Sequence, residues 1–316
     1  MLRVGLVGTG DAGKHHARAL AAAHRERLLD WSCIGAREVA AIEARRADLG
    51  ADPTTRIVST DEALAGGACD AVILATPDGL HHDHAARALA AGLHVLVEKP
   101  IALEVAHAEA LVAAARAADR VLTVGYHLRH HAGHAAIQAR LAELVGRVRT
   151  VHVRWAWPDP ATTGWRAHGE GARWWSLAAL GTHEIDLALW LCGSEVTDVV
   201  GLRDPAAGID RAAEVSLRFE GGALAHISCA ITHRAQPSLV IAGDTGEIEA
   251  RGTLGARGAG MISTTAKGET AELAFIAEDP YLRQLRAFVT RCAGTAPRID
   301  LHAVANLAVL SRIQAP

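Results

Sequence analysis

A glycine-rich turn near the N-terminus constrains the fold of this chain more than any other feature. Residues 2–7 form an apolar run typical of a short buried strand, and residues 15–23 have the alanine-rich composition of a helix. The turn between them consists of Gly8, Thr9, Gly10, Asp11, Ala12 and Gly13. In such a turn the first glycine permits a tight bend, the second lets the backbone approach a pyrophosphate, and the third allows the helix to pack closely on the strand. Because free amides at a helix N-terminus attract phosphates, the segment predicts a dinucleotide site rather than an ordinary turn.

Composition limits the classes of protein to which the chain can belong. Its 316 residues, half of them hydrophobic, are enough for two domains with separate cores. A net charge of -3 gives no reason to expect nucleic acid or an anionic membrane as a partner. The five cysteines are scattered without a CxxC pair, which predicts reduced thiols and a cytoplasmic location. No charge-free run reaches the roughly 18 residues of a membrane span, and a strand that begins at Leu2 leaves no room for a signal peptide.

Strand and helix patterns alternate through residues 1–125. Strands are expected at 30–35, 70–76, 95–97 and 121–125, and helices at 38–49, 81–91 and 104–118. Repeated strand-helix units predict an α/β domain with a doubly wound parallel sheet of the Rossmann type. Ligands of such sheets bind at the carboxyl ends of the strands. Thr76-Pro77, Glu98-Lys99-Pro100 and Gly125-Tyr126 all follow strands, so we expect them to converge with the glycine turn on one crevice.

Residues 126–316 predict a C-terminal α+β domain with a large, mainly antiparallel sheet. Residues 151–157 alternate apolar and polar, and the alternating runs 214–219 and 223–229 flank a glycine turn as a hairpin. A second hairpin is expected around residues 243–246, and helices at 181–191, 281–292 and 301–313. One face of this sheet is expected to cover the cofactor crevice and bind substrate, and the other to pair subunits in a homodimer or homotetramer.

Lys99 is the first candidate catalytic residue. The chain has three lysines (Lys14, Lys99 and Lys267) among 32 basic residues, and Lys99 follows a predicted strand directly. Oxidation of an alcohol needs a group that takes the hydroxyl proton, and a partly desolvated lysine can do so near neutral pH. As an ammonium it would instead stabilise alkoxide charge. The structural alternative is a surface ion pair between Glu98 and Lys99.

The order and spacing of the motifs resemble the Gfo/Idh/MocA family of NAD(P)-dependent oxidoreductases. The motifs that carry the resemblance are Gly8 to Gly13 followed by His16, Thr76-Pro77 with His81, the run 91–100 ending in Glu98-Lys99-Pro100, Gly125-Tyr126 with Arg129, and Gly181-Thr182-His183 with Asp186. The resemblance implies a two-domain fold, hydride transfer between a nicotinamide and a sugar, cyclitol or related carbonyl or alcohol compound, and frequent homo-oligomers. It implies that His183 faces the lysine across the substrate.

Around His183 the sequence departs from the family pattern. The family commonly has an aspartate four residues before this histidine, where this chain has Ala179. Either Lys99 and His183 suffice, or Asp186 or Glu184 substitutes, or the usual alcohol oxidation is lost. Asp186 is three residues from His183, a spacing at which a carboxylate on a helix can reach the imidazole and fix its tautomer. A histidine packed at a helix start is the structural alternative.

Further residues predict substrate contacts and cofactor preference. Trp165, Arg166, Trp174 and Trp175 precede the His183 helix and are candidates for the substrate pocket together with Tyr126, Arg129 and Asp186. Trp155 and Trp157 are expected to be core or interface residues. The second strand ends at Ala36-Arg37 without the acidic residue that usually binds the NAD ribose, which favours NADP over NAD. Most histidines, including those at 127, 130, 131 and 134 where Gly133 would interrupt a helix, are expected in loops or at the surface, and we expect no metal.

The sequence thus favours a cytoplasmic NAD(P)-dependent dehydrogenase or reductase that acts on CH–OH or C=O groups, with C=N possible. The cofactor-binding set comprises the glycine turn, Ala36, Arg37, Thr76, Pro77, His81, Glu98 and Lys99. Two alternatives stay open: a glycoside hydrolase that uses NAD for transient oxidation, and a non-catalytic nucleotide-binding regulator.

Overall fold

The chain folds into two compact units. The computed structural model describes residues 1–159, 165–166, 172–205, 208–294 and 298–313. The first unit comprises Met1–Gly125 with Tyr281–Leu301, and the second comprises Tyr126–Pro280 with His302–Pro316. The second domain expected from the sequence runs unbroken from residue 126 to 316, whereas segment 281–301 belongs to the first unit. No helix of the described residues is both long and apolar enough to cross a membrane.

The first unit contains a six-stranded parallel sheet in the order β3-β2-β1-β4-β5-β6. Its strands are β1 (Arg3–Val7), β2 (Asp30–Ala36), β3 (Arg56–Ser59), β4 (Ala71–Leu74), β5 (His94–Val97) and β6 (Leu122–Val124). Its helices are α1 (Asp11–Arg25), α2 (Val39–Glu43), η1 (Ala47–Leu49), α3 (Thr60–Leu64), η2 (Asp78–Leu80), α4 (His81–Ala90), α5 (Val105–Ala117) and α8 (Pro280–Cys292). This is the expected Rossmann sheet, and the strand order reverses between β1 and β4.

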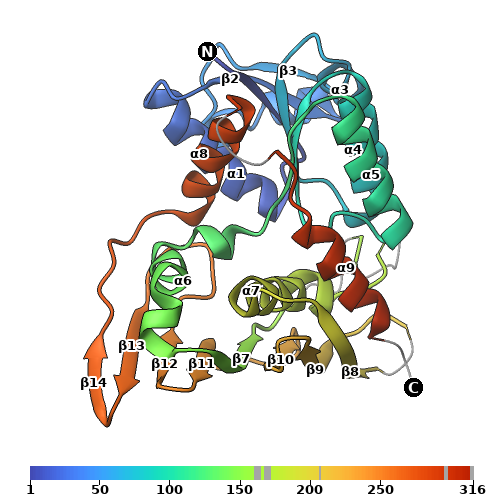
Figure 1. The fold of residues 1–316 in the computed structure, drawn as a ribbon. Helices are drawn as coiled ribbons and strands as arrows, with labels where there is room; N and C mark the ends of the chain where they lie inside the picture. The colour runs from blue at the N-terminus through green and yellow to red at the C-terminus, as the bar shows by residue number, and fades with distance from the viewer. Residues whose placement is uncertain (160–164, 167–171, 206–207, 295–297, 314–316) are drawn as a thin grey trace. The chain divides into compact units, whose positions relative to one another are not determined.

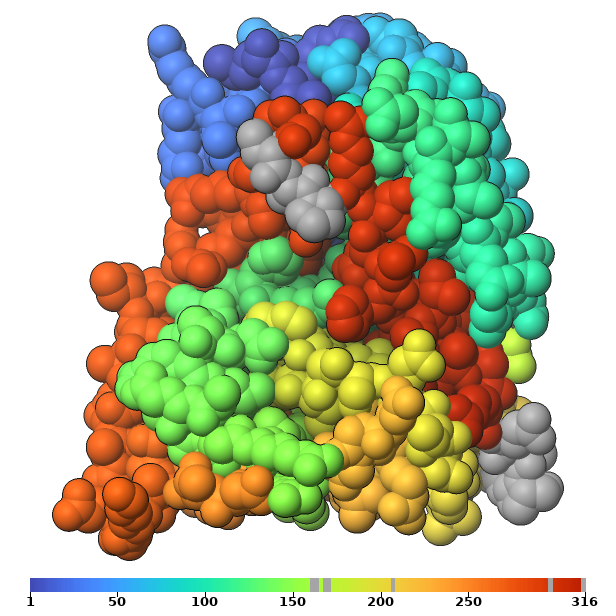
Figure 2. All heavy atoms as spheres, viewed as in Figure 1, coloured from blue at the N-terminus to red at the C-terminus, as the bar shows by residue number. Residues whose placement is uncertain are grey.

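Strand order decides where the helices of this unit lie. Right-handed crossovers from β1 towards β3 and from β4 towards β6 place their helices on opposite faces of the sheet. Figure 1 shows α4 and α5 on one face and α1 on the other, and in the space-filling view α5 forms part of the outer surface (Figure 2). The strands between these layers are apolar: Val4, Leu6, Ile73 and Leu74 are fully buried.

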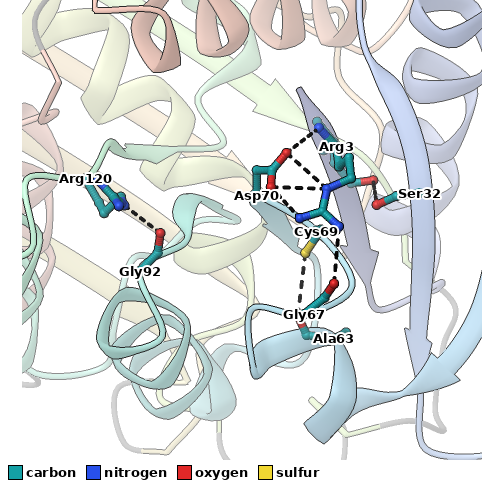
Figure 3. A network of polar contacts seen from close by, with 9 residues as sticks. Arg3, Ser32, Ala63, Gly67, Cys69, Asp70, Gly92 and Arg120 are labelled. Atoms are coloured by element: carbon teal, nitrogen blue, oxygen red, sulfur yellow. Dashed lines mark hydrogen bonds and ion pairs between the residues drawn. The ribbon is translucent and has the colours of Figure 1, made fainter. Parts of the chain in front are cut away.

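An ion pair fastens the amino ends of the central strands. The Arg3 side chain, just inside β1, donates from Nη2 to Oδ1 of Asp70 at 2.6 Å, and its Nη1 donates to the Gly67 carbonyl at 3.2 Å (Figure 3). The Arg3 guanidinium lowers the pKa of the Asp70 carboxyl. The carboxyl ends of β1 and β4 lie at the opposite edge, where ligands of doubly wound sheets bind.

The second unit contains an eight-stranded, mainly antiparallel sheet in the order β14-β13-β12-β11-β7-β10-β9-β8, with β7 and β10 as a parallel pair. Its strands are β7 (Val148–Ala156), β8 (Val196–Asp204), β9 (Ala212–Phe219), β10 (Leu224–Ala230), β11 (Ser238–Gly243), β12 (Gly246–Arg251), β13 (Met261–Ala266) and β14 (Glu269–Glu272). Its helical segments are η3 (His127–His130), α6 (Ala132–Val145), η4 (Leu177–Gly181), α7 (Thr182–Cys192) and α9 (His302–Arg312).

Both predicted hairpins of this unit are present. Strands β9 and β10 pair antiparallel around residues 220–223, and β11 and β12 pair antiparallel around residues 244–245. Alternation along β10 buries Ala225, Ile227 and Cys229, and α6 and α7 lie along this sheet in Figure 1. The expected helix 38–49 is interrupted, because α2 ends at Glu43 and a separate 3₁₀ turn, η1, follows.

Candidate functional site

Two of the three glycines in the N-terminal turn are required by close backbone contacts. Gly8 has φ +98°, and a Cβ there would lie 2.2 Å from the Ala75 carbonyl oxygen. A Cβ at Gly13 would lie 2.2 Å from the Gly8 carbonyl oxygen. The turn therefore packs against the segment after β4, at the point where the strand order reverses.

Gly10 differs from its neighbours because a Cβ there would meet no heavy atom within 4 Å. It is also the N-cap residue of α1 and supplies no side-chain cap, so no capping side chain covers the first amides of a 15-residue helix. Asp11 is exposed and forms an ion pair with Lys14 at 2.9 Å. The open space beside Gly10 and the uncapped helix end together form a place where a phosphate can bind backbone amides.

His81 joins the loops that follow β4 and β5. The ring is fully buried, with Nδ1 2.7 Å from the Pro100 carbonyl oxygen and Nε2 2.8 Å from the Thr76 carbonyl oxygen. Each ring nitrogen of His81 is within hydrogen-bonding distance of a backbone carbonyl oxygen. His81 thus contacts the carbonyl of Pro100, the residue after Lys99, and the carbonyl of Thr76, the residue before Pro77.

Glu98 fixes the backbone of Lys99. Its carboxyl is buried, with Oε1 2.8 Å from His16 Nε2 on α1, and Oε2 accepts a hydrogen bond from the Lys99 backbone amide at 3.2 Å. A Cβ on Gly125 would lie 2.7 Å from Oε1, so glycine is needed there too. The alternative of a surface ion pair between Glu98 and Lys99 is wrong because Glu98 is only 3% exposed. Lys99 itself is half-buried.

In the second unit, aromatic rings surround His183 near the start of α7. The ring centroids of His127, Trp155 and Tyr126 lie 4.7, 5.9 and 6.1 Å from that of His183. His127 and Tyr126 meet it edge to face. No sequence signal connects His127 or Trp155 with this histidine, because their approach depends on η3 and β7 packing beside α7.

Asp210 and Asn306 hold the segment that carries His183. The Asp210 carboxylate accepts from the backbone amides of Trp175 at 3.0 Å and Leu177 at 2.8 Å, and from the Ser176 hydroxyl. Asn306, on α9, accepts from the Thr182 hydroxyl at 2.8 Å and donates to the Thr182 carbonyl at 2.8 Å. Ala179 lies between these anchors in η4, which is a π-helical turn.

The two acidic candidates for the role of the missing aspartate have different environments. Both carboxylate oxygens of Asp186 accept hydrogen bonds from Arg129. Nε donates to Oδ2 at 2.7 Å, and Nη2 donates to Oδ1. Glu184 is fully buried, and burial raises the pKa of its carboxyl well above the usual value. The negative charge of Glu214 also raises the pKa of Glu184, and a hydrogen bond from the Trp155 backbone amide lowers it. Burial thus favours the neutral form of the Glu184 carboxyl.

The tryptophans expected to contact substrate have different environments. Trp174 is only 2% exposed and packs under Arg173, whereas Trp175 is half-buried and donates from Nε1 to Asp159 at 3.3 Å. The guanidinium of Arg166 lies 4.2 Å from the centroid of the half-buried Trp165 ring. Trp157 is not a core residue, because it is 51% exposed.

The prediction that most histidines lie in loops or at the surface is wrong for a group of buried rings. His81, His84, His127, His131 and His134 are all buried, and Gly133 is the second residue of α6 rather than a break in it. His134 contacts the Leu128 carbonyl at 2.9 Å and the Thr253 hydroxyl at 2.8 Å, and burial lowers its pKa to about 3. Among the described residues, no group of three or more His, Cys, Asp or Glu is arranged to hold a metal ion.

Two family profiles match successive parts of the chain. Residues 2–126 match the oxidoreductase family GFO/IDH/MocA with its NAD-binding Rossmann fold. Residues 134–249 match the GFO/IDH/MocA C-terminal domain.

Individual relatives extend this likeness along most of the chain. A 1,5-anhydro-D-fructose reductase from Ensifer adhaerens is 28% identical over 247 residues, which is 74% of each chain. Inositol 2-dehydrogenase 2 from Paenarthrobacter aurescens is 32% identical over 241 residues, covering 68% of this chain and 67% of the relative. The crystal structure of an aldose-aldose oxidoreductase from Caulobacter crescentus has a similar fold, with a TM-score of 0.87 at 23% identity over 98% of this chain and 96% of that one.

Proposed function

Because the chain belongs to the Gfo/Idh/MocA family of NAD(P)-dependent oxidoreductases, we propose that it transfers a hydride between NADP(H) and a ring carbon of a sugar or cyclitol. The observation that carries the proposal is the buried contact of Glu98 with His16 and with the Lys99 amide, which joins the helix after the glycine turn to the lysine. The relatives named as 1,5-anhydro-D-fructose reductase and inositol 2-dehydrogenase support a cyclic polyhydroxylated substrate.

The residues of the first unit fit a dinucleotide. The open space beside Gly10 and the absence of a side-chain cap on α1 support a pyrophosphate position at the helix N-terminus. Arg37, directly after β2, is exposed and has no ion-pair partner among the described residues, which supports recognition of a 2′-phosphate and hence NADP. When bound, the nicotinamide supplies or accepts the hydride.

Lys99 and His183 are the proposed proton-handling residues. We assign to Lys99 the transfer of a proton to or from the substrate oxygen whose carbon exchanges the hydride. His183, held by the rings of Tyr126, His127 and Trp155, is assigned a hydrogen bond to a substrate hydroxyl. The ion pair between Arg129 and Asp186 holds η3 against α7. It thereby also helps to keep the aromatic rings around His183 in place. With Ala179 in place of the family's aspartate, we propose that this packing orients the imidazole.

Native mass spectrometry of the purified chain, followed by a substrate panel, tests the proposal. We expect a mass increase that matches NADP(H), and absorbance changes at 340 nm with cyclic ketoses, inositols or their oxidised forms. A chain that binds no nicotinamide nucleotide, or that binds one and turns over no member of a broad panel, would contradict it. The cytoplasmic location and the homo-oligomeric state stay predictions.

A further inference from the structure

An exposed tryptophan and an arginine form a platform in the second unit. Trp157 is 51% exposed, and the guanidinium carbon of Arg234 lies 3.9 Å from the centroid of its ring. Hydrogen bonds to neighbouring strands hold the backbone at or next to each of these two residues. The Trp157 amide donates to the Ala230 carbonyl at 2.9 Å, and the Ala235 amide donates to the Ala156 carbonyl at 3.3 Å. These bonds continue the pairing of β7 beyond its last residue.

The platform lies two residues along the chain from Trp155, a neighbour of the histidine of the proposed active site. Trp155, on β7, has its ring 5.9 Å from that of His183. Trp157 follows by two positions, and its amide still donates to β10, so we infer that its side chain leaves the same face of the strand about 7 Å further along. That separation suits a ligand whose reacting ring lies by His183 and whose neighbouring group reaches Trp157.

The charge of the platform indicates what it binds. Arg234 is exposed and has no ion-pair partner among the residues that the structure describes. Stacking on the indole restrains the guanidinium plane while its edge keeps N–H donors for an oxyanion, and carboxylates and phosphates fit that fork in a bidentate manner. The exposed part of an indole also offers an apolar surface for a sugar ring.

We propose that Trp157 and Arg234 form a second substrate subsite that binds a carboxylate or phosphate carried next to the reacting sugar ring. The proposal rests on the function proposed above and narrows its substrate class to anionic glycosides. Trp157 packs against the neighbouring sugar unit, and Arg234 pairs with its oxyanion.

Isothermal titration calorimetry tests the subsite without requiring turnover. The ligands are cellobiose, the same disaccharide with a terminal glucuronate, and UDP-glucose, so that the last two separate carboxylate from phosphate. We expect at least one charged ligand to bind about tenfold more tightly than cellobiose, as charge-assisted hydrogen bonds allow. Arg234→Gln should remove that preference. The matched control is Arg154→Gln, an exposed arginine on β7 whose position alternates to the other face of the strand.

The outcomes separate this proposal from the proposed function. Equal binding of charged and neutral disaccharides, or equal losses in Arg234→Gln and Arg154→Gln, would overturn the subsite even if NADPH-linked turnover of a simple ring substrate is seen. A change of oligomeric state in Arg234→Gln, measured by light scattering with the ligand preference intact, would assign the platform to a protein interface instead. Absence of turnover with all ring substrates would contradict the proposed function and leave the binding result valid.

Discussion

Arg129 and Asp186 form a bidentate ion pair that joins turn η3 to helix α7 in the second unit. Both Asp186 oxygens accept from the Arg129 guanidinium, and the aspartate side chain is 1% exposed. Removing one partner leaves a charge in a site from which water is excluded, so Arg129→Met or Asp186→Asn should each cost about 3–5 kcal/mol of unfolding free energy. The double variant should cost less than the sum. Urea denaturation of the four proteins measures the coupling, and strict additivity would refute it.

Substitutions at two glycines of the N-terminal turn should have different effects: Gly13→Ala should lower stability, and Gly10→Ala should weaken cofactor binding. Gly13→Ala places a methyl group 2.2 Å from the Gly8 carbonyl, so it should lower the unfolding free energy by about 1–3 kcal/mol. Gly10→Ala meets no protein atom, so the variant should fold normally and bind NADPH about tenfold or more weakly, because the methyl group occupies space for the pyrophosphate. Thermal melts and NADPH fluorescence titrations measure the two effects. Normal NADPH affinity in Gly10→Ala would argue against the assigned phosphate position.

Lys99 should be essential for turnover and dispensable for cofactor binding. Lys99→Ala should lower kcat by about 10²–10⁴. Lys99→Arg should fail similarly, because a guanidinium keeps its positive charge but does not give up its proton near neutral pH. The control is Lys267→Ala, an exposed lysine between β13 and β14. Substantial activity in Lys99→Arg would show that only the positive charge is needed, and full activity in Lys99→Ala would exclude the lysine.

Glu184 should weaken the fold as pH rises. Burial raises the pKa of its carboxyl in the folded state, so between the unfolded value of about 4.3 and the folded value the native protein binds the extra proton. The stability that this group contributes is therefore complete at low pH and falls by about 1.4 kcal/mol for each pH unit within that window. Glu184→Gln should be more stable than the wild type at pH 8 and about equal at pH 5.

Denaturation at both pH values, with exposed Glu220→Gln as control, checks the sign of the Glu184 effect. Parallel pH profiles of Glu184→Gln and the wild type would show that the carboxyl is ionised in the fold. Turnover should persist in Glu184→Gln, because glutamine resembles the neutral form of the carboxyl that burial favours.

Local signals were sufficient to predict the Rossmann unit and both hairpins. The strand, glycine turn and helix of residues 2–23 depend on contacts between near neighbours, as do the turns at 220–223 and 244–245. The placement of segment 281–301 with the first unit depends on contacts between residues far apart in the sequence. One example is the bridge between Leu122 and Ile299.

The candidate site was harder to predict where its partners come from distant segments. Asp186 is three residues from His183, yet it pairs with Arg129, 57 positions away. His131 and His134 look like surface residues in sequence, but the Ala259 carbonyl and the Thr253 hydroxyl satisfy them in the interior. Residue spacing along one helix therefore did not reveal Arg129 as a partner of Asp186, since the packing of η3 on α7 joins distant segments.

Tracing deuterium from NADPH to product tests the central claim most directly. The chain is supplied with NADPH deuterated at the transferable position of nicotinamide C4 and with each ketone of the ring-substrate panel. We expect one deuterium on the carbinol carbon of each product molecule, one NADP⁺ formed per product, and loss of both in Lys99→Ala while NADPH still binds. Glycoside cleavage without net cofactor change, or nucleotide binding with no deuterium transfer, would contradict it.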